Sequence, residues 1–161
     1  SDVCSSDLAI EQQAPSDWLI RAYAPEDREK LVALWELCGL VRPWNNPYRD
    51  IERKQANRPQ WLRVVEVQRS AKRWELIGSI MIGYEGHRGW VNYLAVHPRW
   101  QGRGIGRALM AEAESLLLAE ACPKLSLLVR SDNEAVRAFY ERLGYRVDQA
   151  LAMGKRLIPD D

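Results

Sequence analysis

The stretch that decides the fold of this chain reads Trp90-Val-Asn-Tyr-Leu-Ala-Val-His-Pro-Arg-Trp-Gln-Gly-Arg-Gly-Ile-Gly-Arg107. Its first part is rich in β-branched and aromatic residues, which is typical of a buried strand, and Pro98 ends that strand. Three glycines follow between Gly102 and Gly106. Apolar residues then recur at helical spacing, at Ile105, Leu109, Ala113, Leu116 and Leu117. The stretch therefore predicts a strand, a glycine-rich loop and a long helix.

The glycine-rich loop is also the first candidate binding site. A loop that leads into a helix leaves backbone N–H groups free, and the positive end of the helix dipole lies behind them. The charges agree, because no Asp or Glu occurs from Gly86 to Ala111, whereas four arginines do: Arg88, Arg99, Arg103 and Arg107. This pattern predicts a site for a phosphate or a pyrophosphate.

The composition excludes several classes of function. The chain has 161 residues, with 23 Lys and Arg against 22 Asp and Glu, so no overall charge attracts nucleic acid. No apolar run approaches the roughly 20 residues that cross a membrane. Three cysteines and two histidines, widely spaced, predict neither a disulfide framework nor a metal site. Free thiols and the absence of a secretory pattern favour a reducing cytoplasm.

The rest of the chain predicts one domain. Residues 1–15 are polar and show no periodicity, so we expect a disordered or non-native leader, followed by a single domain over residues 18–161. The expected class is α/β (α+β), a mixed, mostly antiparallel sheet with one parallel pair, flanked by about four helices. The expected strands are residues 18–23, 61–67, 74–83, 90–96 and 124–129 and a final hairpin of residues 145–147 and 150–157; the expected helices are residues 25–38, 48–56, 103–119 and 131–143.

Three classes of phosphate ligand use a glycine-rich loop before a helix. A P-loop needs Lys and then Ser or Thr after its last glycine, but Arg107 and Ala108 stand there. A dinucleotide site fits Gly102 and Gly104 but finds Arg107 in place of the third glycine. Because Arg130 could select NADP, an NADP-binding oxidoreductase stays a weak alternative. The third class is coenzyme A.

Two blocks of sequence resemble the GNAT family of acetyl-CoA-dependent N-acetyltransferases. The segment Gln101-Gly-Arg-Gly-Ile-Gly106 matches its Q/R-x-x-G-x-G/A signature. The segment Asn133-Glu-Ala-Val-Arg-Ala-Phe-Tyr-Glu-Arg-Leu-Gly-Tyr145 is similar to its N-x-x-A-x-x-x-Y-x-x-x-G-F/Y ending, with Val136 where Ala is commoner. The resemblance covers Trp18 to the C-terminus. It implies a GNAT-like fold with a central, splayed parallel pair of strands and the pantetheine of acetyl-CoA in the gap.

The resemblance also implies a set of residues that bind acetyl-CoA, and no metal. Backbone groups of the strand would bond the pantetheine, the loop amides would hold the pyrophosphate, and Asn133 would position the pantetheine arm. From the residues alone, Asn133 can equally be a helix-start residue. The residues carried over are Leu94, Ala95, Val96, Gln101, Gly102, Arg103, Gly104, Ile105, Gly106, Arg107 and Asn133.

The reaction that the resemblance implies is direct attack of a primary amine on the thioester in a ternary complex. The Val96 N–H would stabilise the oxyanion, and Tyr140 would act as the acid at sulfur. By pattern alone Tyr140 can be a core aromatic, since it shares a helical stripe with Phe139 and Leu143. An alkyl amine, with a pKa of roughly 10.4, needs a base. Glu85 is the first choice and His87 the second, with Asn92 and Tyr93 as water holders; each can also be a turn residue.

The amine acceptor is not read from the sequence. A small molecule, a peptide N-terminus and a lysine side chain all stay open, as do a monomer and a homodimer. The loop after the first helix supplies candidate pocket residues, and its alternative role is that of a rigid connector packed by Trp44. A non-catalytic acyl-CoA sensor is the second function class, because it would keep the glycine loop without needing Tyr140. The candidate acceptor residues are Trp35, Arg42, which hints at an anionic group, Trp44, Asn45 and Tyr48.

Overall fold

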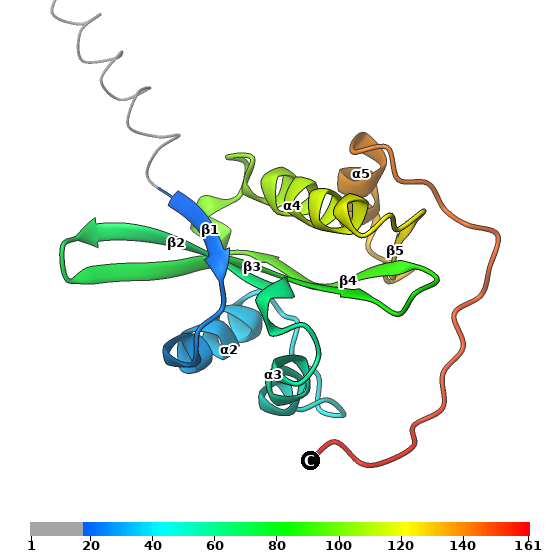
Figure 1. The fold of residues 1–161 in the computed structure, drawn as a ribbon, viewed down its shortest axis with the longest axis horizontal. Coiled ribbons are helices and arrows are strands. Elements are labelled where there is room, and N and C mark those ends of the chain that lie inside the picture. The colour runs from blue at the N-terminus through cyan, green and yellow to red at the C-terminus, as the bar shows by residue number, and fades with distance from the viewer. Residues whose placement is uncertain (1–17) are drawn as a thin grey trace, which may run out of the picture.

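One five-stranded sheet runs through the computed structural model, which describes residues 18–161 (Figure 1). The leader expected at residues 1–15 lies outside the described residues. Neighbouring strands are antiparallel except for the last pair, which is parallel. In spatial order the strands are β1 (Trp18–Ala22), β2 (Leu62–Ser70), β3 (Arg73–Tyr84), β4 (Gly89–Val96) and β5 (Leu125–Leu127).

Helices cover both faces of the sheet (Figure 1). One face carries α2 (Arg28–Leu37) and α3 (Pro47–Gln55), and the other carries α4 (Ile105–Ala119) and α5 (Glu134–Arg142). Each face has its own core of buried residues, so the sheet is apolar on both sides. This arrangement confirms the predicted fold class: a mixed, mostly antiparallel sheet with one parallel pair and four α-helices among the described residues. Short 3-10 turns precede α2, β2 and α4: η1 (Pro25–Asp27), η2 (Pro59–Trp61) and η3 (Pro98–Trp100).

Strand β4 carries a bulge near its middle. Its register against β3 shifts between Ser79 and Met81, and Tyr93 has a φ of +52°. That conformation is rare for a residue with a side chain, and buried groups stabilise it here. The Ser79 hydroxyl donates to the Tyr93 carbonyl at 2.8 Å and accepts from Trp35 Nε1 at 2.9 Å. The Trp35 ring also stacks on the Tyr93 ring, with centroids 3.7 Å apart. Helix α2 therefore fixes the bulge.

The parallel pair separates after three residues. Strand β5 pairs with Gly89–Val91 only, and residues 92–96 of β4 have no strand partner on that edge within the described chain. The sequence predicted a strand over residues 124–129, and the observed strand spans Leu125–Leu127. The side of β4 next to residues 92–96 is therefore left without ladder bonds, where the family resemblance implies that the two strands splay; we call this unpaired region the gap.

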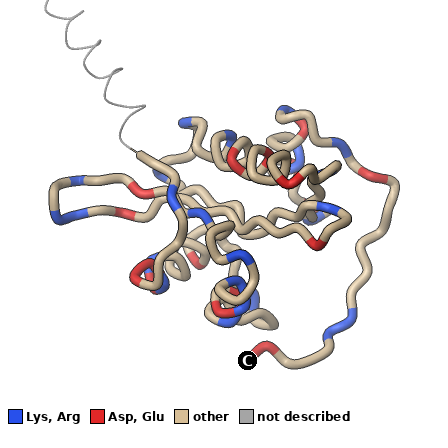
Figure 2. Tube along the Cα trace, in the orientation of Figure 1, with Lys and Arg blue, Asp and Glu red and all other residues tan. Residues whose placement is uncertain are grey.

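The final hairpin predicted at residues 145–147 and 150–157 is wrong. No strand forms after α5, and the chain runs as an extended segment around the open edge of the sheet (Figure 1). Ion pairs hold both of its ends: Lys124 Nζ lies 2.8 Å from Asp148, and Arg53 lies 2.7 Å from Asp160. Between Asp148 and Lys155 this segment is uncharged (Figure 2). Alternating apolar residues did not make a strand here, because β5 offers only three residues for pairing.

Candidate active site

The loop before α4 presents unpaired backbone donors. Among residues 18–161, none of the N–H groups of residues 101–107 donates to a protein acceptor; the first bond of the helix runs from Ala108 N–H to the Gly104 carbonyl, at 3.0 Å. Gly102 and Gly104 have φ values of +79° and +83°, a region that favours glycine. A run of free amides at a helix N-terminus is a site for an anion.

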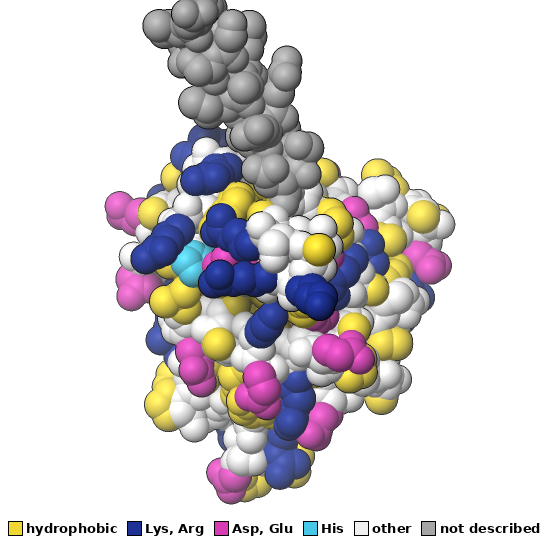
Figure 3. Space-filling view, turned by 90° about the vertical axis from the view of Figure 1, so that its left-hand side faces the viewer, with side chains coloured by type: hydrophobic (Ala, Val, Ile, Leu, Met, Phe, Trp, Pro, Cys, Tyr) yellow, Lys and Arg dark blue, Asp and Glu magenta, His cyan; other side chains and the backbone are white. Residues whose placement is uncertain are grey.

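The surroundings of this loop are basic and closely packed. Figure 3 shows Lys and Arg side chains gathered on the side of the molecule that carries the β2–β3 hairpin and the loop before α4. Arg103 lies over the Trp100 ring at 4.5 Å and Arg69 at 5.6 Å. A Cβ placed on Gly106 would lie 3.1 Å from Phe139 Cζ, so glycine at that position allows α5 to pack against the start of α4.

The edge of β4 beside the gap also offers backbone groups. Val96 lies opposite Gly78, and His97 N–H donates to the Ile77 carbonyl at 2.8 Å. In an antiparallel ladder this makes Val96 a non-hydrogen-bonded residue, so its own N–H and C=O point away from β3 and towards the gap. Leu94 lies within the bulge, beside the same unpaired edge of β4. The Val96 carbonyl accepts from Gln101 Nε2 at 3.2 Å, and the ladder register gives the Val96 N–H no acceptor on β3.

Helix α5 brings Tyr140 to this region. Its ring is buried at 8% exposure and meets Phe139 and Tyr145 edge to face, so the residue is part of the core. Its hydroxyl reaches the surface and has no hydrogen-bond partner among residues 18–161. Burial raises the pKa of Tyr140 to about 12, so the hydroxyl carries its proton at neutral pH. Both interpretations of Tyr140, core aromatic and proton-bearing group, are compatible with this geometry.

Asn133 begins α5 and caps it. Its Oδ1 accepts from the Val136 N–H at 3.2 Å, which is the helix-start role that the residues alone indicated. Its amide NH2 group makes no hydrogen bond within the described part of the chain. A single asparagine can therefore cap the helix with its oxygen and still offer two donors to a ligand.

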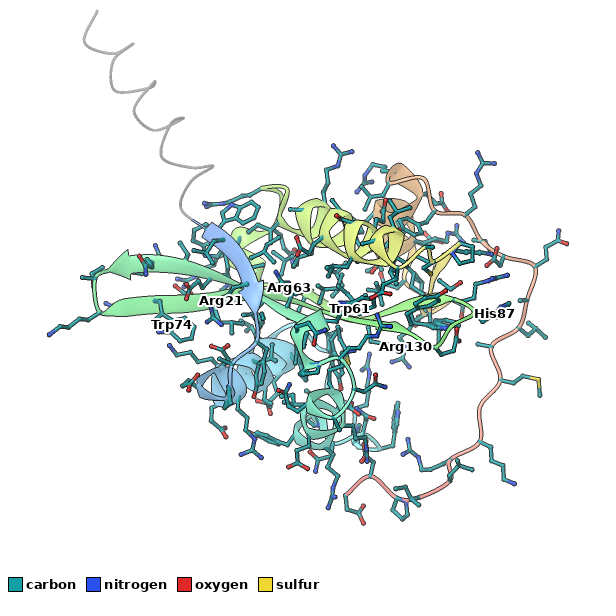
Figure 4. All side chains as sticks on the ribbon, in the orientation of Figure 1. Arg21, Trp61, Arg63, Trp74, His87 and Arg130 are labelled. Carbon is teal, nitrogen blue, oxygen red and sulfur yellow. The ribbon has the colours of Figure 1, made fainter. Side chains whose placement is uncertain are left out.

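Glu85 caps a turn at the far end of β4. Its carboxylate accepts from the N–H groups of Arg88 and His87 and from Trp90 Nε1, at 3.3 Å for Trp90. These bonds, that to Arg88 first, lower the pKa of Glu85, which makes it a weaker base. The turn precedes Gly89, whereas the gap begins after Val91, and His87 lies at the tip of the hairpin (Figure 4). The structure does not bring Glu85 or His87 to the gap.

The residues expected around the acceptor separate into two groups. Trp35 is fully buried and stacks on the Tyr93 ring. Asn45 Nδ2 donates to the Tyr93 hydroxyl at 2.9 Å. Tyr48 points elsewhere, donating to Glu29 at 2.9 Å. Trp44 is 55% exposed, and Arg42 is half-buried with no ion pair among residues 18–161. Trp44 is therefore too exposed to pack the connector as the alternative interpretation expected.

Sequence reasoning missed Asp50, which joins this group from α3. Its Oδ2 lies 2.6 Å from the Tyr93 hydroxyl and 2.6 Å from Asn45 Nδ2, and its side chain is 22% exposed. In the sequence it is one of several charged residues in a short polar helix. Nothing in that pattern indicates that it faces the sheet.

Other kinds of site have little support in the described chain. Residues 18–161 contain no group of three His, Cys, Asp or Glu side chains placed to hold a metal ion. None of their helices is long and apolar enough to span a bilayer. Two hollows of about 400 and 260 Å³ flank Tyr145, next to the free edge of β5. They are lined by α4, α5 and the following segment, and neither includes the glycine loop.

Comparison with known proteins agrees with this geometry. The sequence profile of the acetyltransferase (GNAT) family matches residues 17–145, so the chain belongs to that family. An acetyltransferase of Sodalis glossinidius is 49% identical over 142 residues, which cover 88% of this chain and 96% of the relative. The chain is accordingly an acyltransferase of this family.

Solved structures share the fold. Ard1 from Thermoplasma volcanium superposes with a TM-score of 0.67 at 21% identity, covering 82% of this chain and 84% of its own. AAC(6')-Iy, solved with the bisubstrate analogue CoA-S-monomethyl-acetylneamine, gives 0.65 at 15% identity, covering 88% and 99%. At such identities the likeness concerns the fold alone.

Proposed function

We propose that this acyltransferase transfers the acetyl group of acetyl-CoA to a primary amine by direct attack in a ternary complex. The observation that carries the proposal is the run of unpaired amides from Gln101 to Arg107 beside the parted strands β4 and β5. Amides bonded to neighbouring carbonyls, or strands paired along their whole length, would leave no place for acetyl-CoA.

The residues present fit acetyl-CoA. The free amides of residues 101–107, with Arg103 and Arg107 beside them, suit a pyrophosphate, and each hydrogen bond to a charged group contributes roughly 1.5–3 kcal/mol. The backbone of Leu94 and Val96 would pair with the two amides of pantetheine, as an added strand does. The free NH2 group of Asn133 would donate to the same arm. When bound, acetyl-CoA supplies an activated acyl carbon.

The protein groups at the gap then assist the transfer. The Val96 N–H points away from β3 and would donate to the oxygen on which charge develops. The Tyr140 hydroxyl would donate a hydrogen bond to the leaving sulfur. Because burial raises the pKa of Tyr140 to about 12 and a thiol has a pKa near 8.5, full proton transfer is uphill by about 5 kcal/mol. Tyr140 therefore acts first as a hydrogen-bond donor, and the thiolate takes a proton that the amine loses.

The test combines binding with turnover. Calorimetry with acetyl-CoA and with NADPH decides the cofactor, and release of free thiol with a panel of primary amines decides whether the protein is a catalyst. We expect binding of acetyl-CoA, none of NADPH, and amine-dependent thiol release. Binding of acetyl-CoA without thiol release for any amine would instead support a sensor, and binding of NADPH would support an oxidoreductase.

A further inference from the structure

Carboxylates on the α2–α3 face differ in how far they are open to a ligand. Asp160 is 4% exposed, with Arg53 at 2.7 Å on one oxygen and the Asn46 N–H at 2.9 Å on the other, whereas the Asp50 side chain is 22% exposed. Asp50 is engaged mainly through Oδ2, whereas Oδ1 has only Arg53, at 3.2 Å. A carboxylate offers about four acceptor positions, so Asp50 keeps at least one for a ligand.

Asp50 lies on the side of the sheet from which an acceptor can reach the gap. Its partner Tyr93 is the residue at the bulge, directly before Leu94, whose backbone borders the gap. The glycine loop and α5 lie on the opposite face of the sheet (Figure 1). Because those elements would hold acetyl-CoA, the acceptor has its free approach from the α2–α3 face. Asp50 lies on that approach, one tyrosine side chain away from the bulge.

The surrounding groups hold the carboxylate in place. Asn45 Nδ2 and the Tyr93 hydroxyl both donate to Oδ2, and Trp35 stacks on the Tyr93 ring. Arg53 links Asp50 to Asp160, the penultimate residue of the chain. A polar group fixed by three partners on a rigid helix and strand has the order that catalysis requires.

Resting on the proposed function, we propose that Asp50 binds the cationic amine of the acceptor and takes its proton. The acceptor class is therefore a primary amine that arrives as an ammonium ion, with Asp50 as a catalytic residue and Asn45 and Tyr93 as positioning residues. The contacts around Glu85 offer no equivalent group, since that carboxylate is occupied by turn amides at the other end of β4.

The protons balance as follows. An ammonium ion carries three N–H protons, and the first passes to Asp50 as the nitrogen lone pair becomes free. That lone pair forms the new C–N bond while the C–S bond breaks. The second proton goes to the leaving sulfur, and the third stays on the amide nitrogen of the product. Asp50, which is 22% exposed, then releases its proton to water.

The test compares Asp50→Asn with Glu52→Gln, which removes the same charge from an exposed position of the same helix. With the amine that the wild type acetylates best, Asp50→Asn should lower kcat/KM about 10²-fold or more at pH 7. The Kd for acetyl-CoA should change less than about twofold, as in Glu52→Gln, because the acetyl-CoA groups lie on the other face.

The pH profile separates proton transfer from a structural role. Without Asp50 only the free amine reacts, so kcat/KM of Asp50→Asn with an alkyl amine should rise about tenfold per pH unit towards a pKa of roughly 10.4. In the wild type and in Glu52→Gln, kcat/KM should stop rising at a lower pH than in Asp50→Asn. The charged and titratable groups in contact with Asp50 are Arg53 and Tyr93; Asp160 lies on the other side of Arg53, with Arg156 near it, and all four are unchanged in both variants.

Each outcome decides the question. An Asp50→Asn enzyme with the pH profile and kcat/KM of Glu52→Gln would overturn the proposal while the proposed acetyl transfer stands. A wild type that binds acetyl-CoA but releases no thiol with any amine would overturn both. Should Asp50→Asn fail to fold, Asp50→Glu carries the test, since it keeps the charge beside Arg53 and displaces the carboxylate. Full activity in that variant, with unchanged acetyl-CoA affinity, would also overturn the proposal.

Discussion

On the α4–α5 face most of the groups available to a ligand belong to the backbone, with Asn133 and Tyr140 added from α5, whereas on the α2–α3 face they belong to side chains. The backbone groups come from two neighbouring segments, the amides of residues 101–107 and the edge of β4. The side chains on the α2–α3 face come from three separate segments, with Asn45 in a loop, Asp50 on α3 and Tyr93 on β4. A backbone site depends on glycines at fixed spacing, and a side-chain site depends on how distant segments pack. The following experiments test that difference.

The largest expected effect concerns the stability of the side-chain face. Lys54 on α3 is 8% exposed and donates to the Ile82 carbonyl, and burial lowers its pKa to about 8. The unfolded chain binds that proton up to a pKa of about 10.5, so between pH 8 and 10 the unfolded state holds more protons and stability rises with pH. Between these two pKa values, Lys54 raises the free energy of unfolding by about 3 kcal/mol.

Substitution Lys54→Met should remove this contribution. Denaturant unfolding at pH 7 to 10 gives the free energy of unfolding of the wild type and of Lys54→Met. The difference between these two values isolates the contribution of Lys54, because the other titrating groups are the same in both proteins. Exposed Lys72→Met, in the β2–β3 turn, is the matched control and should follow the wild type. If the difference in free energy of unfolding between wild type and Lys54→Met stays constant with pH, the pKa of Lys54 is not lowered by burial.

The next effect tests Tyr140, the side chain that we propose the α4–α5 face contributes to the chemistry. Tyr140→Phe keeps the ring in the core and removes a hydroxyl that has no partner among residues 18–161. Turnover should fall about 10²-fold, while the melting temperature and the Kd for acetyl-CoA stay close to wild type. Tyr145→Phe, whose hydroxyl instead donates to Glu114 at 2.7 Å, is the control ring. Equal turnover in wild type and Tyr140→Phe would leave this residue only its role in the core.

The contrast between the two faces explains what the sequence could predict. The glycines, Pro98 and the helical stripe from Ile105 are local signals, and the strand, loop and helix follow as predicted. The Tyr93 bulge depends on Ser79 and Trp35, which lie 14 and 58 residues away in the chain, and no local pattern reports it. Asp50 was missed for the same reason, and Trp35 was expected in a pocket although it is fully buried. The C-terminal hairpin failed because alternation says nothing about whether a partner edge exists.

A smaller effect tests the claim that the backbone forms the acetyl-CoA site. Gly104→Ala adds a Cβ that meets no atom within 4 Å, but the φ of +83° costs a side chain about 1–2 kcal/mol. If the loop relaxes to relieve that cost, its amides turn and the Kd for acetyl-CoA rises about 5- to 30-fold, as calorimetry would show. Gly154→Ala, also in open space and without a positive φ, should change nothing. An unchanged Kd in Gly104→Ala would mean that these amides do not hold the ligand.

The smallest expected effect is that of Glu85→Gln. Its carboxylate is occupied by the Arg88 and His87 amides, so the amide side chain can keep part of the turn, and the gap lies beyond Val91. We expect kcat/KM to stay within about twofold of wild type and the acidic limb of the pH–rate profile to remain, because the turn supplies no proton acceptor to the amine. Loss of that limb in Glu85→Gln, with Asp50→Asn unaffected, would reverse the assignment: the base would then belong to a local turn next to β4, and the side-chain cluster on α3 would be structural.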